Sequence, residues 1–199
     1  MICCISGAPD IQQIIVAGND SLHENEFEKK LYIARLQVEK ILNDPELYIC
    51  SLSSKVISYK GLIVSENIQK FYPDLTHKDM KTSLCVFHQR FSTNTAPSWN
   101  LAQPFRAIAH NGEINTYRGN KNWMKVHEQE MNSPLFDDVE NLKPVIQQGA
   151  SDSAALDNVF ELLNISGQPA PLAKLMLVPD AWSKKNKTLP KDHQQLLIF

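Results

Sequence analysis

The sequence predicts an α+β fold, and three kinds of segment lead to that prediction. A long stretch with helical periodicity lies near the N-terminus, segments rich in β-branched and aromatic residues follow it, and two further helical patterns lie in the C-terminal half. Strands and helices are mixed without the strict alternation of βαβ units, which argues against a regular parallel sheet. The length of 199 residues suits one domain, or a large part of one.

The first helix is predicted from apolar residues at helical spacing between Phe27 and Leu42. Ser21 and Glu24 have the spacing of a capping box ahead of it, and the Asn43-Asp44-Pro45 segment stops it. Residues 11–16 predict a short strand before this helix. Four basic side chains of the helix are expected to face water: Lys29, Lys30, Arg35 and Lys40.

The middle of the chain predicts most of the strands. Residues 47–53 and 56–63 are rich in β-branched and aromatic side chains, and the short gap between them predicts a hairpin. Residues 84–88 and 107–110 are predicted as buried strands joined by a polar loop. An apolar run at residues 172–178 predicts one more buried strand near the C-terminus.

Two helices are predicted in the second half of the chain. Over residues 120–130 we expect Trp123 and either Val126 or His127 to face inward. Over residues 152–163 one apolar stripe is formed by Leu156, Val159, Phe160 and Leu163.

Composition narrows the classes of function. A formal net charge of −2 gives no reason to expect a nucleic-acid partner, and no apolar run approaches the roughly 18 residues of a membrane span. No signal peptide is apparent. Four scattered cysteines without a C-x-x-C pair predict neither zinc nor a disulfide framework, and they favour a reducing, cytoplasmic compartment: Cys3, Cys4, Cys50 and Cys85.

A polar segment at residues 88–95 contains a candidate site for a carboxylate. Arg90 offers a planar fork that matches a carboxylate with two hydrogen bonds, and the nearby Thr93 hydroxyl can add a donor. The alternative is an ordinary strand end with an exposed arginine and a Ser/Thr turn.

A second polar segment, residues 109–116, contains Asn111 followed by Gly112. This pair is first of all a turn signal. It is also a suitable oxyanion-hole pair, because glycine lets its backbone N–H approach a developing oxyanion closely beside the Asn side-chain amide.

The third segment, residues 149–153, leads into the predicted helix at 152–163. Ser151 is a natural N-cap, and Asp152 lies in the first turn, where the helix dipole favours an anion. That account is complete in structural terms, but Asp152 could also bind an ammonium group. Together the three segments offer groups for a carboxylate, an oxyanion and an amine, which suits a free amino acid with an acyl group to be attacked.

The same segments resemble glutamate synthase large subunits. The resemblance is strongest in His88 to Met124, and it extends to Tyr48–Ser54 and to Ser151–Leu163. The segments Phe27–Arg35 and Phe71–Leu75 also resemble that family, so the similar region covers roughly residues 27–182. No second domain is expected: residues 1–199 are interpreted as a partial glutamine amidotransferase domain.

The resemblance implies a class II glutamine amidotransferase with the αββα sandwich of the N-terminal-nucleophile hydrolases. Such a domain hydrolyses L-glutamine to glutamate and ammonia, and the ammonia passes through a tunnel to meet 2-oxoglutarate. FMN and an iron–sulfur cluster belong to later synthase domains, with a small reductase subunit as a further partner. No cofactor is implied for this chain, and a plastid location is possible if the parent is photosynthetic.

The resemblance also implies roles for individual residues. Arg90 would bind the α-carboxylate of glutamine with help from Thr93, beside the aromatic Phe91. Asp152 would hold the α-ammonium group. The oxyanion would be bound by Asn111 and Gly112, while His88 and His110 would be structural.

The N-terminus departs from the family pattern. The nucleophile of that family is an N-terminal cysteine whose own α-amino group acts as the base, whereas this chain begins Met1-Ile2-Cys3-Cys4. With an apolar run at residues 196–199 as well, the chain is expected to be a fragment incomplete at both ends and inactive alone. The alternatives are a non-catalytic module that binds glutamine or glutamate, and a degenerate remnant.

Overall fold

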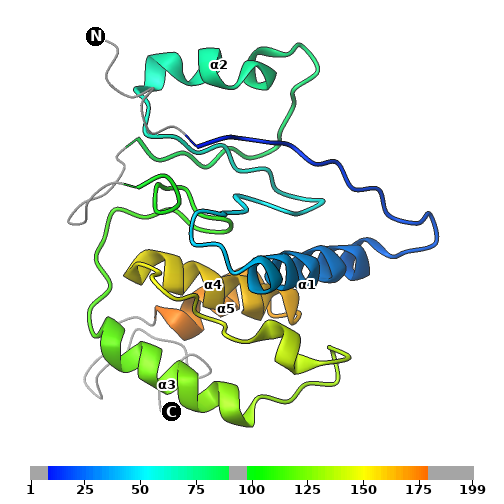
Figure 1. Cartoon of the computed structure of the whole chain (residues 1–199), viewed down its shortest axis with the longest axis vertical. Coiled ribbons are helices and arrows are strands. Elements are labelled where there is room, and N and C mark those ends of the chain that lie inside the picture. The colour runs from blue at the N-terminus through cyan, green and yellow to red at the C-terminus, as the bar shows by residue number, and fades with distance from the viewer. Residues whose placement is uncertain (1–8, 90–97, 179–199) are drawn as a thin grey trace, which may run out of the picture.

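The computed structural model describes residues 9–89 and 98–178, in which helices are joined by long irregular segments (Figure 1). Helices α1, α4 and α5 lie together in the middle, with α2 at one end and α3 at the other (Figure 1). The elements in chain order are α1 (Glu24–Leu42), η1 (Ser65–Asn67), α2 (Ile68–Phe71), η2 (Pro73–Thr76), α3 (Tyr117–Glu130), η3 (Val139–Leu142), α4 (Asp152–Ile165) and α5 (Ala170–Leu177). No described helix is both long and apolar enough to cross a membrane.

The ends of α1 test two sequence predictions. The predicted stop is confirmed, because Asn43 takes the left-handed conformation at φ 45° and donates its backbone N–H to the Glu39 carbonyl. The predicted capping box is wrong. The N-cap is His23, which makes no side-chain capping bond, and Ser21 lies in the turn before it.

The predicted inward face of α3 is wrong by one position. Trp123 is 67% exposed and Val126 is 48% exposed, and His127 is exposed as well. The side chain that packs onto the core is that of Met124. The sequence pattern alone could not identify the position of α3 that faces the core, because the apolar residues Trp123 and Val126 lie on either side of Met124.

Near the C-terminus, residues 172–178 form most of α5 instead of the predicted strand. Pro169 and Ala170 begin the helix, and Ala173 is fully buried. Helices α4 and α5 pack against each other. A short apolar run suits a buried helix as well as a buried strand, and here the packing against α4 decides between them.

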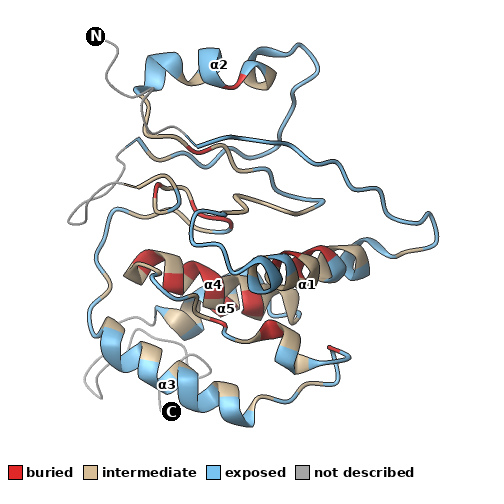
Figure 2. Cartoon of the chain, in the orientation of Figure 1, coloured by how far each residue is buried: buried red, intermediate tan, exposed pale blue. Residues whose placement is uncertain are grey.

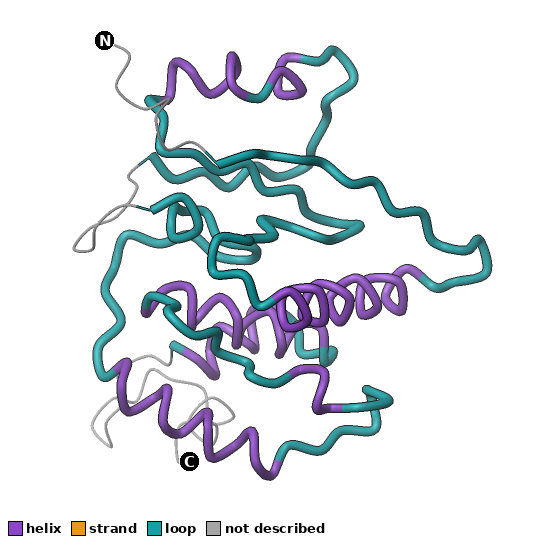
Figure 3. The backbone as a smooth tube through the Cα atoms, in the orientation of Figure 1, coloured by secondary structure: helices purple, strands orange, loops and turns teal. Residues whose placement is uncertain are grey.

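None of the other predicted strands forms in the described residues (Figure 3). Residues 11–16, 47–53, 56–63, 84–88 and 107–110 are all irregular backbone. The two segments of the proposed hairpin are joined through side chains: the Ser58 backbone N–H donates to the Ser51 hydroxyl at 3.1 Å, the Val56 N–H to the Ser53 hydroxyl at 3.1 Å and Lys60 to the Tyr48 hydroxyl at 3.2 Å. Side-chain pattern marks a segment that suits a sheet, but a strand exists only when a partner backbone is in hydrogen-bonding range.

The apolar core lies where α1, α4 and η3 meet, as the buried residues in Figure 2 show. Its members come from helices and loops far apart in the sequence: Tyr32, Phe136, Leu142, Val145 and Leu162. Val159 of the predicted α4 stripe packs against this cluster.

Beside the apolar core lies a buried charged cluster, which we define as Arg35, Glu39, Arg106 and Glu161. Arg35, predicted to face water, is only 2% exposed and pairs with Glu161 at 2.5 Å and with Glu39 at 3.3 Å. Arg106 pairs with Glu39 at 3.1 Å. Burial of a charge requires such partners, and although Glu39 lies one turn away on α1, Glu161 lies on α4, where the periodicity of α1 gives no sign of it.

Candidate functional site

The start of α4 carries the first candidate group. Ser151 is the N-cap as predicted, because its hydroxyl accepts the Ala154 backbone N–H at 3.1 Å. The half-buried Asp152 follows it, and its Oδ1 atom accepts the Ser153 backbone N–H at 2.7 Å. Its Oδ2 atom accepts the backbone N–H of Ile114 at 3.1 Å. This bond joins α4 to the segment that contains Asn111 and Gly112.

A second contact joins the same two segments. The His110 ring Nε2 lies 2.7 Å from the Ser153 hydroxyl, and His110 comes directly before Asn111. The His88 ring Nε2 lies 3.1 Å from the His110 carbonyl oxygen. The ring of His110 therefore links the segment that contains Asn111 and Gly112 to α4.

Asn111 and Gly112 lie between these two anchor points, and both are exposed. Gly112 has no positive φ, and a Cβ atom built on it would meet His110 Nδ1 at an ordinary 3.6 Å. Backbone conformation therefore does not require glycine here. Among the described residues, and apart from the two chain neighbours of Gly112, no other atom lies within 4 Å of that Cβ position, and an exposed glycine lets a ligand approach the backbone closely.

Arg90, Phe91 and Thr93 lie outside the described residues. Of the predicted site residues, the structure describes Asn111, Gly112 and Asp152. Asn111 and Gly112 belong to one segment, and that segment is hydrogen-bonded to the first turn of α4, beside Asp152.

Gln103 is a contributor that the sequence reasoning missed. Its side-chain Nε2 donates to the His110 carbonyl at 3.0 Å, and its Oε1 accepts the His110 backbone N–H at 2.8 Å. The sequence gives no signal for this role, because Gln103 is one polar residue in a polar loop.

Asp157 is a second missed contributor. It is 1% exposed, and its carboxylate accepts the backbone N–H groups of Arg106, Ala107 and Ile108 at 3.1, 2.8 and 2.9 Å. Burial raises the pKa of Asp157 above its ordinary value, and the three N–H donors oppose that rise. The sequence signal for this role was weak, because Asp157 is one of three acidic residues in α4.

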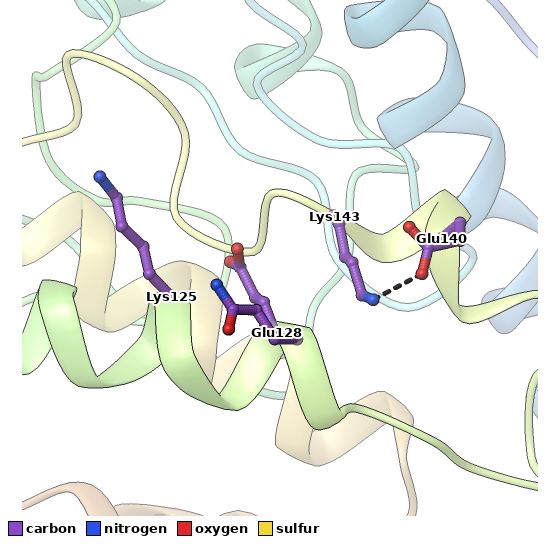
Figure 4. Close-up of a pocket in the computed structure, with 5 residues that line it drawn as sticks. Lys125, Glu128, Glu140 and Lys143 are labelled. Carbon is purple, nitrogen blue, oxygen red and sulfur yellow. Dashed lines mark hydrogen bonds and ion pairs between the residues drawn. The ribbon is translucent and has the colours of Figure 1, made fainter.

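A surface pocket of about 470 Å³ lies between α3 and η3, away from these residues (Figure 4). Its walls carry charges of both signs: Lys125, Glu128, Gln129, Glu140 and Lys143. Lys143 pairs with Glu140 at 2.5 Å, and Glu128 accepts the Val145 backbone N–H at 2.7 Å. Three of the charged side chains, those of Lys143, Glu140 and Glu128, thus already have partners within the protein.

Metal and thiol chemistry can be tested on the described residues alone. They contain no group of three or more His, Cys, Asp and Glu side chains placed to hold a metal ion. The described cysteines, Cys50 and Cys85, are free thiols. Burial raises the pKa of Cys50, which disfavours the thiolate that a nucleophile or a cluster ligand needs. The described residues therefore do not fit an iron–sulfur cluster.

Comparison with known proteins agrees with the three-segment resemblance. The family model described as "Glutamine amidotransferases class-II" matches residues 3–198. The chain is 48% identical over 195 residues to the glutamate synthase [NADPH] large chain of Azospirillum brasilense, covering 96% of this chain and 13% of that protein. It is 42% identical to the chloroplastic ferredoxin-dependent glutamate synthase of Oryza sativa subsp. japonica, covering 96% of this chain and 12% of that protein.

A third relative is the glutamate synthase [NADH] of Saccharomyces cerevisiae, 48% identical over 165 residues, with 81% of this chain and 8% of that protein covered. The chain thus spans about an eighth or less of the length of these relatives. Class II membership implies the N-terminal-nucleophile hydrolase fold. The chain belongs to the class II glutamine amidotransferases, in the branch formed by the glutamate synthases.

Proposed function

We propose that this chain forms the glutamine-binding part of a glutaminase within a glutamate synthase. The reaction of that site adds water to the side-chain carboxamide of L-glutamine and releases glutamate and ammonia. One observation carries the proposal. Residues 109–116, which contain Asn111 and Gly112 and which we call the oxyanion segment, are bonded to the first turn of α4 through His110–Ser153 and Ile114–Asp152. Two separate family segments therefore meet beside one carboxylate.

Asp152 is proposed to bind the α-ammonium group of glutamine. A carboxylate has about four lone-pair positions, and three of those of Asp152 accept from the backbone N–H groups of Ile114 and Ser153 and from the Ser153 hydroxyl, which leaves one for a ligand. The side chain is half-buried, so an ion pair with the ligand is less screened than one on an open surface. The two backbone donors also orient the carboxylate before a ligand arrives.

Asn111 and Gly112 are proposed as the donors that bind the carboxamide oxygen and, after attack, the oxyanion. Support comes from their exposure and from the open space beside Gly112. For the α-carboxylate we propose Arg90 with Thr93, next to Phe91. This part of the proposal rests on the match of these residues to the family pattern and on the geometry of the guanidinium fork.

We infer that the 199-residue chain binds glutamine without cleaving it. Among the described cysteines, Cys50 is a poor nucleophile because burial raises the pKa of its thiol. A binding module is therefore the second candidate function. Measurement of ammonia release from L-glutamine by the purified chain tests it, and steady release abolished by Cys3→Ala or Cys4→Ala would overturn it.

The synthase chemistry is assigned elsewhere in the family protein. We propose that FMN, an iron–sulfur cluster, the 2-oxoglutarate site and contacts to a reductase subunit lie outside this chain, linked to it by ammonia transfer. A cytoplasmic or plastid location fits, since the rice and spinach relatives are chloroplastic by name.

Calorimetric titration of the chain tests the binding proposal. We compare L-glutamine with 4-carbamoylbutanoate, which lacks the α-ammonium group. Asp152→Asn should weaken L-glutamine binding about tenfold or more, because a charge-assisted hydrogen bond is lost, and should leave 4-carbamoylbutanoate unchanged. Exposed Asp137→Asn is the matched control and should change neither titration. Absence of any heat with L-glutamine, or equal heats before and after Arg90→Ala, would contradict the proposal.

A further inference from the structure

We infer that Gln103 is a positioning residue, which aims the Asn111 and Gly112 donors at the carboxamide of the ligand and so lets the site distinguish glutamine from amino acids without that group. This inference rests on the proposed function. Gln103 itself is not placed in contact with the ligand: it acts through the backbone of His110, the residue directly before Asn111.

The contact between Gln103 and His110 has two bonds of opposite direction. The side-chain amide donates to the His110 carbonyl at 3.0 Å and accepts from the His110 N–H at 2.8 Å. Both peptide groups flanking His110 are thereby held by one planar amide. A neighbouring strand would make the same pair of bonds, and no strand forms in the described residues around this segment.

Other contacts hold the backbone on both sides of the turn at Asn111 and Gly112. Asp157 holds the backbone N–H groups of residues 106–108, and Ser153 holds the His110 ring. The His88 ring lies 3.1 Å from the His110 carbonyl oxygen, and further along the chain Ile114 donates its backbone N–H to Asp152. Among these contacts Gln103 is the one that bonds both the N–H and the carbonyl of His110, so its amide sets the direction in which Asn111 and Gly112 follow.

This arrangement has a consequence for specificity. The donors of Asn111 and Gly112 can form hydrogen bonds only with a ligand that carries an acceptor oxygen at the end of its side chain. L-norvaline has the same α-carboxylate, α-ammonium group and five-carbon chain as L-glutamine, but it lacks the carboxamide oxygen and nitrogen. Loss of the two bonds from Gln103 should therefore weaken glutamine binding and leave norvaline binding intact, whereas general loosening of the fold would weaken both.

The test titrates the full chain with L-glutamine and L-norvaline by calorimetry. Wild type should prefer L-glutamine. Gln103→Ala should lower the affinity for L-glutamine about threefold to tenfold, the range of one or two lost neutral hydrogen bonds, with norvaline within about twofold of wild type. Gln147→Ala is the matched control: Gln147 is equally half-buried and bonds Glu39 through its side-chain amide, outside the site. It should keep the wild-type preference.

A second variant separates positioning from packing. Gln103→Glu keeps the side-chain length and one acceptor, but at pH 8 it sets a carboxylate oxygen against the His110 carbonyl. It should lose the preference for glutamine as Gln103→Ala does. Full preference in either variant would overturn the inference, as would equal losses for both ligands. A wild-type chain that binds neither ligand would instead overturn the proposed function.

Discussion

The carboxylate of Asp157 on α4 accepts the backbone N–H of Ala107, fifty residues earlier in the chain, at 2.8 Å. The neighbouring N–H groups of Arg106 and Ile108 donate to the same side chain. One buried acid thus replaces the hydrogen-bond partners that a sheet would have supplied to this segment. It also ties the loop leading to Asn111 to the helix that begins with Asp152.

Replacing this acid should destabilise the fold. Asp157→Asn substitutes an amide whose NH₂ group must face backbone donors, so at least one buried N–H loses its acceptor. We expect the free energy of unfolding to fall by about 1–3 kcal/mol in urea titrations at pH 7. The exposed Asp137→Asn should change it by less than about 0.5 kcal/mol. Equal stability of Asp157→Asn and wild type would contradict the role assigned to the three N–H bonds.

The buried charged cluster predicts a larger effect. Arg35→Met removes the arginine that forms an ion pair with Glu161, whereas Glu39 keeps Arg106 at 3.1 Å. An uncompensated buried carboxylate should lower the free energy of unfolding by about 3–5 kcal/mol. Adding Glu161→Gln should restore part of the loss, which a double-mutant cycle measures.

Two comparisons limit that interpretation. Lys55→Met removes a cation from the exposed pair with Glu24, at 3.6 Å, and should cost no more than about 1 kcal/mol. Burial already raises the pKa of Glu161, so the penalty of Arg35→Met should shrink as pH falls and that carboxyl is protonated. If the loss in free energy of unfolding caused by Arg35→Met depended neither on pH nor on the added Glu161→Gln substitution, lost packing would be the cause instead.

Helix capping at α4 gives a prediction with an internal control. Ser151→Ala removes the acceptor for the Ala154 N–H and should lower the free energy of unfolding by about 0.5–2 kcal/mol. Ser21→Ala, at the capping box that the sequence suggested for α1, should have little effect because His23 is the N-cap. Thermal and urea unfolding of both variants measure the difference, and a larger loss for Ser21→Ala would reverse this assignment.

Lys60 predicts a dependence of stability on pH. Its side chain is 3% exposed, bonds the Asn100 carbonyl at 2.8 Å and the Tyr48 hydroxyl at 3.2 Å, and lies over the Tyr48 ring. Burial lowers the pKa of Lys60 from 10.5 to about 8. A lowered folded-state pKa disfavours the folded state when the lysine is charged, so this group adds stability as pH rises from 8 towards 10.5 and loses it as pH falls through 8.

The measurement compares wild type with Lys60→Met between pH 7.5 and 10. Relative to the variant, wild type should gain roughly 2 kcal/mol in free energy of unfolding over pH 8–10. Tyr48 and Tyr72, whose pKa values burial raises to about 12, stay largely protonated in the folded state over this range. Parallel pH profiles for the two proteins would rule out a lowered pKa for Lys60.

Three features could be predicted from the residues alone: the family, the helix at 152–163 with its Ser151 cap, and the stop of α1 at Asn43. These are local features: a cap, a left-handed residue and a run of matching residues are each defined within a few positions of the chain.

Only the tertiary structure decided which segments pair and which charges are buried. Arg35 is buried because Glu161, 126 residues away, neutralises it, and the α5 run is helical because α4 lies beside it. The predicted strands lack a hydrogen-bonding partner in the described residues, a fact that no single segment encodes. Gln103 bonds the backbone of His110 and Asp157 bonds the backbone of residues 106–108; every residue has such backbone groups, so these roles leave little trace in the sequence.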